Sequence, residues 1–326
     1  MINSFPFFSI VMPVYNVENY LRASLDSILN QTFIDYEVIC INDGSTDSSL
    51  SILEEYSIKS TKIHIIDQLN NGLSASRNKG IQESRGDYIF FLDSDDWIVP
   101  DTLKLLFEKQ SGEDMICFNG HRYFENGTTE EPDCGIEEKE LTGWEYYNKY
   151  ALIYRKFHFV CTVLRIYRRD FLLQYKLFFK EGIFHEDNLF TPIACYYAKV
   201  IKVIPDCLYV YRIRQGSITQ TTNPKRFIDI ILVANFLSNF FIPINGIDKN
   251  VIYREISGEY FKCFIPEQLG NCVIERNELK KRINWEYFKI VSIYPRHKRI
   301  YSLLKIHFRL FIFYLAIEEK MRAKYR

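Results

Sequence analysis

The chain has 326 residues, of which 47% are hydrophobic and 25% are charged, and its formal net charge at pH 7 is zero. This length and composition predict two globular domains, or one large domain with an appendage, and they exclude a disordered chain. The charge is unevenly placed, because Lys and Arg outnumber Asp and Glu by about ten from Lys280 to Arg326.

The 8 cysteines are scattered along the chain. Cys40, Cys117, Cys161 and Cys195 lie inside apolar runs rather than in Cys-x-x-Cys pairs, so we expect reduced thiols, with neither a zinc site nor disulfides. The N-terminus has no basic stretch followed by a long apolar run, as a signal peptide would have. Both features favour a cytoplasmic protein.

Short apolar runs alternate with helical patterns in the first part of the chain. Strands are expected in the apolar run at residues 7–14, where Pro13 would end the strand, and at residues 36–42, 63–66 and 88–92. Helices are expected between them, with Asn16 capping the first and Ser74 capping the third. The alternation predicts a doubly wound, Rossmann-like α/β fold, in which helices flank a mostly parallel sheet.

Polar clusters follow three of these strands, at Tyr15-Asn16, Asp43-Gly44-Ser45 and Asp93-Ser94-Asp95-Asp96. In an open α/β sheet, ligands bind at the edge formed by the carboxyl ends of the strands. The three carboxylates of the last cluster would repel one another unless a cation lies among them, and Mg²⁺ or Mn²⁺ with substrate phosphates meets that need. The alternative is an acidic turn in which Asp96 or Asp101 caps the next helix.

A nucleotide laid across this edge would use the polar groups differently. Asp43 can accept a hydrogen bond from a base N–H or a ribose hydroxyl. The sequence has no Gly-x-Gly-x-x-Gly after the first strand and no Walker lysine motif, so a glycine cradle for phosphates is not supported. The metal and Arg77 are expected to hold the phosphates instead.

Four motifs in order, at residues 9–18, 42–47, 71–78 and 93–96, resemble those of the family 2 glycosyltransferases of the GT-A fold. The resemblance covers about residues 7–220. It implies a nucleotide-diphospho-sugar donor, usually a UDP-sugar, and transfer with inversion at the anomeric carbon.

The resemblance also implies residue roles. It assigns to the nucleotide Pro13, Val14, Tyr15 and Glu18, to the uracil Asp43, and to the base or diphosphate Asn71 and Arg77. Asp93, Ser94 and Asp95 match the family's Asp-x-Asp, which contacts the ribose. Asp95, with Asp93, is expected to bind the metal.

Residues 112–170 are the expected acceptor region, because the family varies most there. Strands at residues 114–119 and 121–124 are expected to pair, followed by an acidic loop at residues 129–140. A further helix is expected to begin at residues 141–144, with Trp144, Tyr147 and Leu152 in the core.

Glu186 and Asp187 stand together at an expected helix start. Inverting transfer needs a base that takes the proton of the acceptor hydroxyl, and one carboxylate suffices. The resemblance favours Asp187 as the base and Glu186 as its support. The alternative is ordinary acidic charge at a helix N-terminus, which stabilises the helix dipole without any function. His185 and His158 are expected to be structural.

A closing strand and loop are expected at residues 208–219, again by resemblance. Arg212 and Arg214 can then fold over the departing diphosphate, because guanidinium groups bind phosphate through two hydrogen bonds. The alternative is a surface strand end with solvated arginines.

The pattern becomes helical near Lys225, with apolar residues at helical spacing: Phe227, Ile231, Ala234, Leu237 and Phe241. We therefore divide the chain into a catalytic domain at residues 1–222 and a helical, basic and aromatic region at residues 223–326. The apolar run at residues 306–317 is shorter than the ~20 residues that cross a bilayer.

This C-terminal region is expected to touch the inner face of the plasma membrane peripherally, with basic residues on anionic headgroups. The alternative is that it packs on the catalytic domain or on a second subunit of a homo-oligomer. No nucleic-acid recognition motif accompanies the basic residues, so nucleic acid is not an expected partner.

Together these features predict an inverting, metal-dependent glycosyltransferase that moves a sugar from a UDP-sugar to a saccharide or lipid-linked acceptor in polysaccharide, capsule or lipopolysaccharide biosynthesis. The alternatives are a metal-dependent nucleotidyltransferase, which would release pyrophosphate, and a non-catalytic nucleotide-sugar-binding protein. A glycoside hydrolase is disfavoured, because two carboxylates flanking the bond do that chemistry without a nucleotide site.

Overall fold

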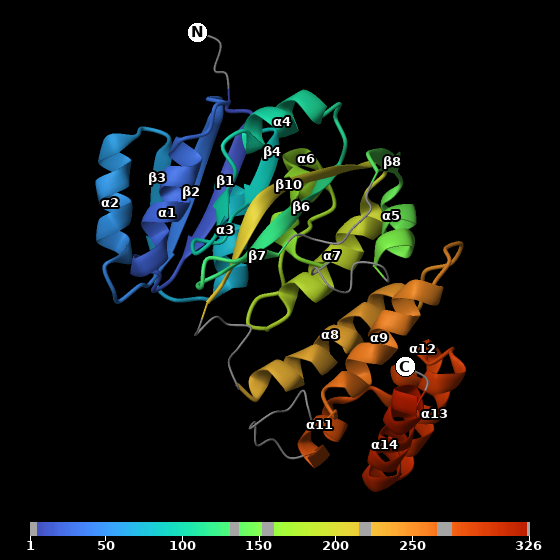
Figure 1. Ribbon diagram of the computed structural model, residues 1–326. Coiled ribbons are helices and arrows are strands. Elements are labelled where there is room, and N and C mark those ends of the chain that lie inside the picture. Colours follow the sequence, from blue (N-terminus) through green and yellow to red (C-terminus); the bar gives the residue numbers. More distant parts are fainter. Residues whose placement is uncertain (1–4, 131–136, 152–159, 215–222, 266–275, 325–326) are drawn as a thin grey trace. The chain divides into compact units, whose positions relative to one another are not determined.

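The computed structural model describes residues 5–130, 137–151, 160–214, 223–265 and 276–324 (Figure 1). The chain divides into two compact units. Unit 1 comprises Met1–Gly182 and Glu186–Gln220, and unit 2 comprises Ile183–His185 and Thr221–Arg326. Unit 1 carries every residue that the sequence assigns to the site. His185, predicted to be structural, belongs to unit 2.

A mixed sheet of ten described strands organises unit 1, in the order β3-β2-β1-β4-β9-β6-β10-β5, with β7 beside β6 and β8 beside β10. The strands are β1 Phe8–Val14, β2 Tyr36–Asp43, β3 Ile63–Gln68, β4 Tyr88–Phe91, β5 Trp97–Ile98, β6 Met115–Phe124, β7 Thr129–Glu130, β8 Lys139–Leu141, β9 Arg165–Arg168 and β10 Ile201–Ile213. The helices of this unit are α1 Glu18–Leu29, α2 Ser49–Lys59, α3 Leu73–Glu83, α4 Thr102–Lys109, α5 Gly143–Tyr150, α6 Arg169–Gln174 and α7 Glu186–Tyr197, with a 3-10 turn η1 at Thr162–Leu164.

The strand directions place several chain segments at one edge of the sheet. β3, β2, β1 and β4 are parallel, whereas β9 is antiparallel to both β4 and β6, and β10 is parallel to β6. The carboxyl ends of β1, β2, β4, β6 and β10 therefore meet at the same edge, together with the start of β9. We call it the carboxyl edge. The predicted α/β sheet flanked by helices is confirmed (Figure 1).

The central strands are apolar because helices cover them. Every residue of β1, β2 and β4 is buried, as expected for parallel strands with two covered faces. Gly80 shows how closely α3 packs on β1: a Cβ atom there would lie 2.1 Å from Val11 Cγ1. A side chain at position 80 would push the helix off the sheet.

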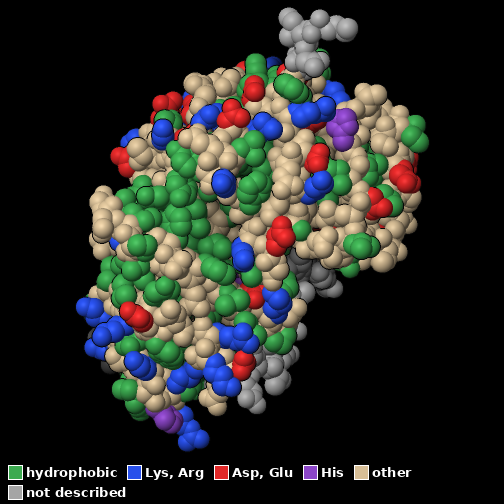
Figure 2. Space-filling view, turned by 180° about the vertical axis from the view of Figure 1, so that it is seen from behind, with side chains coloured by type: hydrophobic (Ala, Val, Ile, Leu, Met, Phe, Trp, Pro, Cys, Tyr) green, Lys and Arg blue, Asp and Glu red, His purple; other side chains and the backbone are tan. Residues whose placement is uncertain are grey.

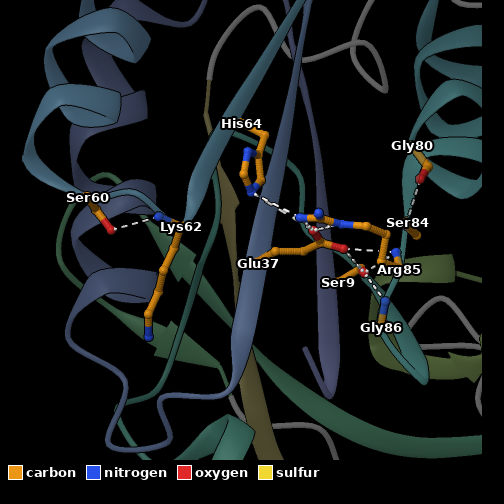
Figure 3. Close-up of polar contacts among 9 residues, drawn as sticks. All are labelled: Ser9, Glu37, Ser60, Lys62, His64, Gly80, Ser84, Arg85 and Gly86. Atoms are coloured by element: carbon orange, nitrogen blue, oxygen red, sulfur yellow. Dashed lines mark hydrogen bonds and ion pairs between the residues drawn. The ribbon is translucent and has the colours of Figure 1, made fainter. Parts of the chain in front are cut away.

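At the opposite edge, a buried carboxylate ties three segments together (Figure 3). Glu37, near the start of β2, accepts hydrogen bonds at Oε1 from Ser9 Oγ (2.7 Å) and Arg85 N (2.8 Å), and at Oε2 from Arg85 Nε (2.9 Å). Ser9 Oγ in turn accepts from Gly86 N at 2.8 Å. The cluster fixes the turn between α3 and β4 against β1 and β2.

The predicted helix caps are wrong. α1 begins at Glu18 after Val17, and the Asn16 side chain instead accepts a hydrogen bond from Thr46 N at 2.8 Å. Ser74 lies inside α3, which begins at Leu73 after Gly72. At α1 the acceptor comes from a loop distant in sequence, because Asp47 Oδ2 accepts from Glu18 N.

The two strands predicted at residues 114–119 and 121–124 are one strand, β6. β10 pairs with β6 from Ile201 beside Met115 to Ile213 beside Phe124, with irregularities between Val203 and Cys207 and between Cys207 and Tyr209. Gly120, between the two predicted strands, is a point of close backbone approach, where a Cβ atom would lie 2.7 Å from Tyr209 O. The predicted helix after residue 141 is confirmed as α5, with a Thr142–Glu145 capping box. Within it Tyr147 is buried, and Trp144 is half-buried.

Unit 2 is helical, as predicted. Its helices are α8 Lys225–Phe241, α9 Asn250–Lys262, α11 Arg276–Arg282, α12 Trp285–Val291, α13 Pro295–Ile306 and α14 Phe308–Lys324. The predicted stripe of α8 is buried at Ile231, Ala234, Leu237 and Phe241, and half-buried at Phe227. Across the described ranges, no helix has the length and hydropathy needed to cross a bilayer. Leu152, His158 and residues 215–219 lie outside the described residues.

Candidate active site

The carboxyl edge collects side chains from five parts of the sequence. Asp43 ends β2, the acidic loop of residues 93–96 follows β4, and Arg212 is near the end of β10. Arg77 comes from α3, and Glu186 and Asp187 begin α7. The structure thus brings Glu186 and Asp187, the predicted catalytic base and its support, to the acidic loop that follows β4.

Arg77 joins these parts. Its Nη2 donates to Asp93 Oδ1 at 3.0 Å, and its Nη1 donates to Glu186 Oε1 at 2.8 Å and to Asp187 Oδ1 at 3.2 Å. The Arg77 side chain is only 2% exposed, and its guanidinium carbon lies 5.3 Å from the centre of the Phe179 ring. One buried cation therefore faces three carboxylates.

Burial and charge oppose each other at Arg77. Burial lowers its pKa, but the neighbouring carboxylates of Asp93, Asp187 and Glu186 outweigh burial, and the net pKa is raised. The role expected from the sequence was a contact with the base or diphosphate, and this stays a prediction. Sequence reasoning missed that Arg77 is the counter-ion of Glu186 and Asp187, the predicted catalytic base and its support.

Glu186 and Asp187 point toward groups outside their own helix. Asp187 Oδ2 accepts from Thr162 N at 3.1 Å, so the backbone of η1 and the guanidinium of Arg77 hold its two oxygens. Burial, followed by the charge of Asp187, raises the pKa of Glu186 to about 7, against the opposing effect of Arg77. Acidic residues that only stabilise a helix dipole need no such contacts. Glu186 and Asp187 therefore do more than supply charge at the start of α7.

Asp96 is a structural member of the acidic loop. It is 1% exposed, and it accepts from Arg212 N at 2.7 Å and from Tyr209 Oη at 2.6 Å. Burial, with the nearby charges of Asp95 and Asp93, raises its pKa. Asp96 does not cap the next helix. Asp101 directly precedes α4, but its side chain caps no helix N–H and accepts instead from Thr32 Oγ1 at 2.7 Å.

Arg212 and Arg214 are bound to the same loop and are not fully solvated. Arg212 Nε donates to Asp95 O at 2.9 Å, and Arg214 Nε donates to Asp95 Oδ2 at 2.8 Å. The Arg212 guanidinium lies 4.6 Å from the Trp97 ring and 5.2 Å from the Tyr20 ring. No local pattern in the sequence indicates these aromatic supports, because Tyr20 and Trp97 lie in α1 and β5, far from Arg212 along the chain.

Two other residues assigned to the nucleotide-sugar donor, Asp43 and Glu18, hold the loops after β3 and β2. Asp43 is 2% exposed and accepts from Asn71 N at 2.9 Å and from Gly72 N at 2.8 Å. Glu18 accepts from Ser48 N at 2.9 Å.

Solvent exposure differs among the residues assigned to the nucleotide. Tyr15 is exposed, whereas Pro13, Val14 and Ser94 are buried. Their contacts with a nucleotide, like those of Asp43, Glu18 and Asn71, stay predictions.

The acidic loop fits a divalent ion that is completed by its substrate. The side chains of Asp93 and Asp95 are 28% and 23% exposed, and in each the bonds found within the described ranges go to one carboxylate oxygen. No group of three metal-ligating side chains occurs in the described part of the chain. One or two carboxylates, with phosphates and water, is the arrangement in which Mg²⁺ is usually held.

Comparisons with known proteins agree with this geometry. The family model described as glycosyl transferase family 2 matches residues 9–175. The glycosyltransferase EpsH of Bacillus subtilis (strain 168) is 36% identical over 227 residues, which cover 68% of this chain and 65% of that protein. The poly(ribitol-phosphate) beta-glucosyltransferase of Bacillus spizizenii is 35% identical over 214 residues, which cover 64% of this chain and 32% of that protein. The chain therefore spans less than two thirds of the length of both relatives.

Among solved structures, S. aureus TarS 1-349 in complex with UDP-GlcNAc superposes with a TM-score of 0.72. It is 22% identical in sequence, and the match covers 97% of this chain and 92% of that chain. This likeness confirms the predicted GT-A fold.

Proposed function

The chain belongs to glycosyl transferase family 2, and from this we propose that it transfers a sugar from a UDP-sugar to the hydroxyl group of a saccharide or lipid-linked acceptor, with inversion. The acceptor belongs to a polysaccharide-type pathway. Support comes from the relatives, one of which is named for a poly(ribitol-phosphate) acceptor, and from TarS, whose structure contains UDP-GlcNAc.

The observation that carries the proposal is the bridge made by Arg77. It connects Asp93 of the acidic loop to Glu186 and Asp187 at the start of α7. Arg77 is separated in sequence by 109 residues from Glu186 and by 110 residues from Asp187. A donor site and a base must lie within one sugar's reach of each other for transfer to occur. The bridge supports the proposal, because one guanidinium group contacts both Asp93 and the carboxylate pair.

In the proposed reaction, Asp187 takes the proton of the acceptor hydroxyl. The acceptor oxygen then attacks the anomeric carbon, and the bond between that carbon and the diphosphate oxygen breaks on the opposite face, which inverts the configuration. Thr162 N and Arg77 orient the Asp187 carboxylate. Glu186 adjusts the charge around it, and Arg212 and Arg214 contact the departing diphosphate.

Asp95 and Asp93 would hold Mn²⁺ or Mg²⁺ beside the diphosphate. When bound, the ion supplies positive charge to the leaving group. Arg214 donates to Oδ2 of Asp95, so Oδ1 would be the oxygen that holds the ion.

The test combines donor binding with transfer. UDP-, GDP- and CDP-sugars are screened by thermal shift with and without Mn²⁺, and acceptor mixtures are then analysed by mass spectrometry. We expect UDP-sugars to stabilise the chain most. Asp187→Asn should bind the donor normally and transfer roughly 10²–10⁴-fold more slowly.

Asp170→Asn is the matched control, since that side chain is 80% exposed, and it should behave like the wild type. Release of pyrophosphate from a nucleoside triphosphate would replace the proposal with nucleotidyl transfer. Wild-type turnover in Asp187→Asn would remove Asp187 from the mechanism.

A further inference from the structure

The outer face of α14 carries an apolar stripe. Its members are exposed by 48%, 66%, 39% and 52% at Leu310, Phe313, Ile317 and Met321. Spacings of three, four and four residues place them on one side of the helix. Scattered single apolar residues on a surface need no explanation, but four along one helix face are a patch.

The stripe is not the side by which α14 packs on its own unit. Phe311 is fully buried, and Arg296 of α13 binds Glu318 of α14 through Nε at 2.7 Å and Nη2 at 2.8 Å. Tyr314 also donates to Glu318 at 3.2 Å. These contacts fix the rotation of α14, so the stripe faces outward because of the packing.

Exposed cations lie on the same helix as the stripe and on the neighbouring helix α13. Arg309 and Lys320 are exposed on α14, one or three residues from stripe members, and Lys298, Arg299 and Lys305 are exposed on α13. The acid Glu319 lies on the other side of the helix from the stripe. Figure 2 shows Lys and Arg side chains gathered among hydrophobic ones over the helices of unit 2.

We propose that this face of α13 and α14 docks on an anionic lipid bilayer, with the stripe in the acyl boundary and the cations on the headgroups. A helix lying in the interface needs an apolar face and flanking Lys and Arg, and each basic residue near an anionic surface strengthens binding. A bilayer offers both an apolar layer and negative charge to one flat surface.

A second copy of the chain fits the same face less well. Residues 280–326 carry about ten more Lys and Arg than Asp and Glu, so two such faces would repel each other. Nucleic acid would satisfy the cations but would leave the aliphatic stripe in water. The bilayer is the one partner that accounts for both features.

The test is co-sedimentation of the full chain with vesicles of phosphatidylcholine alone or mixed with phosphatidylglycerol. We expect the chain to bind the anionic vesicles, more weakly at high salt, and not to bind the neutral vesicles. The double variant Phe313→Ser, Ile317→Ser should bind at least about tenfold more weakly. Arg309→Glu with Lys320→Glu should lose the preference for anionic vesicles.

Ile58→Ser with Ile290→Ser is the matched control, since both side chains are exposed but lie outside α13 and α14, and it should bind like the wild type. Binding unchanged by the stripe variant, or lost equally in the control, would overturn the proposal. So would a wild-type dimer in light scattering that the stripe variant abolishes. Vesicle binding needs neither donor nor acceptor, so its failure would leave the proposed transfer reaction intact.

Discussion

At the scale of single residues, the site is governed by a charge imbalance. Arg77 supplies one positive charge to Asp93, Glu186 and Asp187, so two negative charges remain when all three carboxylates are ionised. Burial is the main reason why the pKa of Glu186 is raised to about 7, and the negative charge of Asp187 adds to it although the site contains an arginine. The charge imbalance also favours the arrival of a cation beside Asp93 and Asp95.

Removing Arg77 should therefore destabilise the fold as well as the site. Arg77→Ala leaves three carboxylates facing one another without a counter-ion, and we expect it to lower the free energy of unfolding by about 3–5 kcal/mol. Urea unfolding measures the change. Arg22→Ala removes an arginine from the exposed pair with Glu55 and should cost far less. Equal losses in the two variants would contradict the central place given to Arg77.

Glu186 should leave a pH signature on stability. Its pKa is raised from 4.5 to about 7, so between those values the folded chain keeps a proton that the unfolded chain releases. The free energy of unfolding consequently falls as the pH rises through this window. Glu186→Gln removes that dependence, so the stability of the variant minus that of the wild type should increase between pH 5 and pH 8, by on the order of 1–3 kcal/mol. Urea unfolding of both proteins at both pH values measures this difference in stability. A difference that does not change with pH would show that the pKa of Glu186 is not raised.

The identities of these residues could be predicted from the sequence, but not their partners. Asp93 and Asp187 stand out because each occurs in a short local motif. The bond from Arg77 to Glu186 spans 109 residues, and no local pattern indicates which carboxylate a distant arginine meets. The same holds for Arg212, whose aromatic supports Tyr20 and Trp97 come from α1 and β5.

At the scale of secondary-structure elements, the buried parallel strands were predictable and the caps of α1 and α3 were not. Buried parallel strands leave continuous apolar runs, which can be seen in the sequence. The start of α1 is capped from another loop: Asp47 Oδ2 accepts from Glu18 N, and Ser49 Oγ accepts from Val17 N, both at 3.0 Å. A rule that looks for a cap next to the helix assigned this role to Asn16.

The Glu37 cluster gives a test at this scale, because it joins β1, β2 and the α3–β4 turn away from the site (Figure 3). Glu37→Gln keeps the side-chain shape but loses the charge-assisted bonds from Arg85, and we expect it to lower the free energy of unfolding by about 1.5–3 kcal/mol at pH 7. Transfer activity per folded molecule should not change.

The loss should shrink in acid. Burial raises the pKa of Glu37, but the bonds from Arg85 and Ser9 outweigh burial and the net pKa is lowered. The stabilisation is therefore present above its ordinary value of 4.5 and disappears as the pH falls through the folded value. Urea unfolding of both proteins at neutral and acidic pH checks this. A loss that grows in acid would contradict the assignment.

At the scale of the whole molecule, the chain consists of two compact units. The predicted site residues all belong to unit 1, and the apolar stripe of α14 belongs to unit 2. The change from short apolar runs to helical spacing near residue 225 is the basis of the predicted boundary between residues 222 and 223. The assignment of catalysis to residues 1–222 stays a prediction, which ligand-dependent unfolding can test.

Each unit has its own buried core, so heating should unfold the chain in two steps rather than one. A ligand that binds only folded unit 1 stabilises that unit by about 2.7 kcal/mol at a concentration 100 times its dissociation constant. UDP with Mn²⁺ should therefore raise the temperature of one calorimetric transition and leave the other in place. Asp95→Asn should remove the additional shift that Mn²⁺ gives over UDP alone, because Asp95 is the principal expected ligand of the metal. Equal movement of both transitions would mean that the donor site is not confined to unit 1, and an unchanged Mn²⁺ shift in Asp95→Asn would place the metal elsewhere.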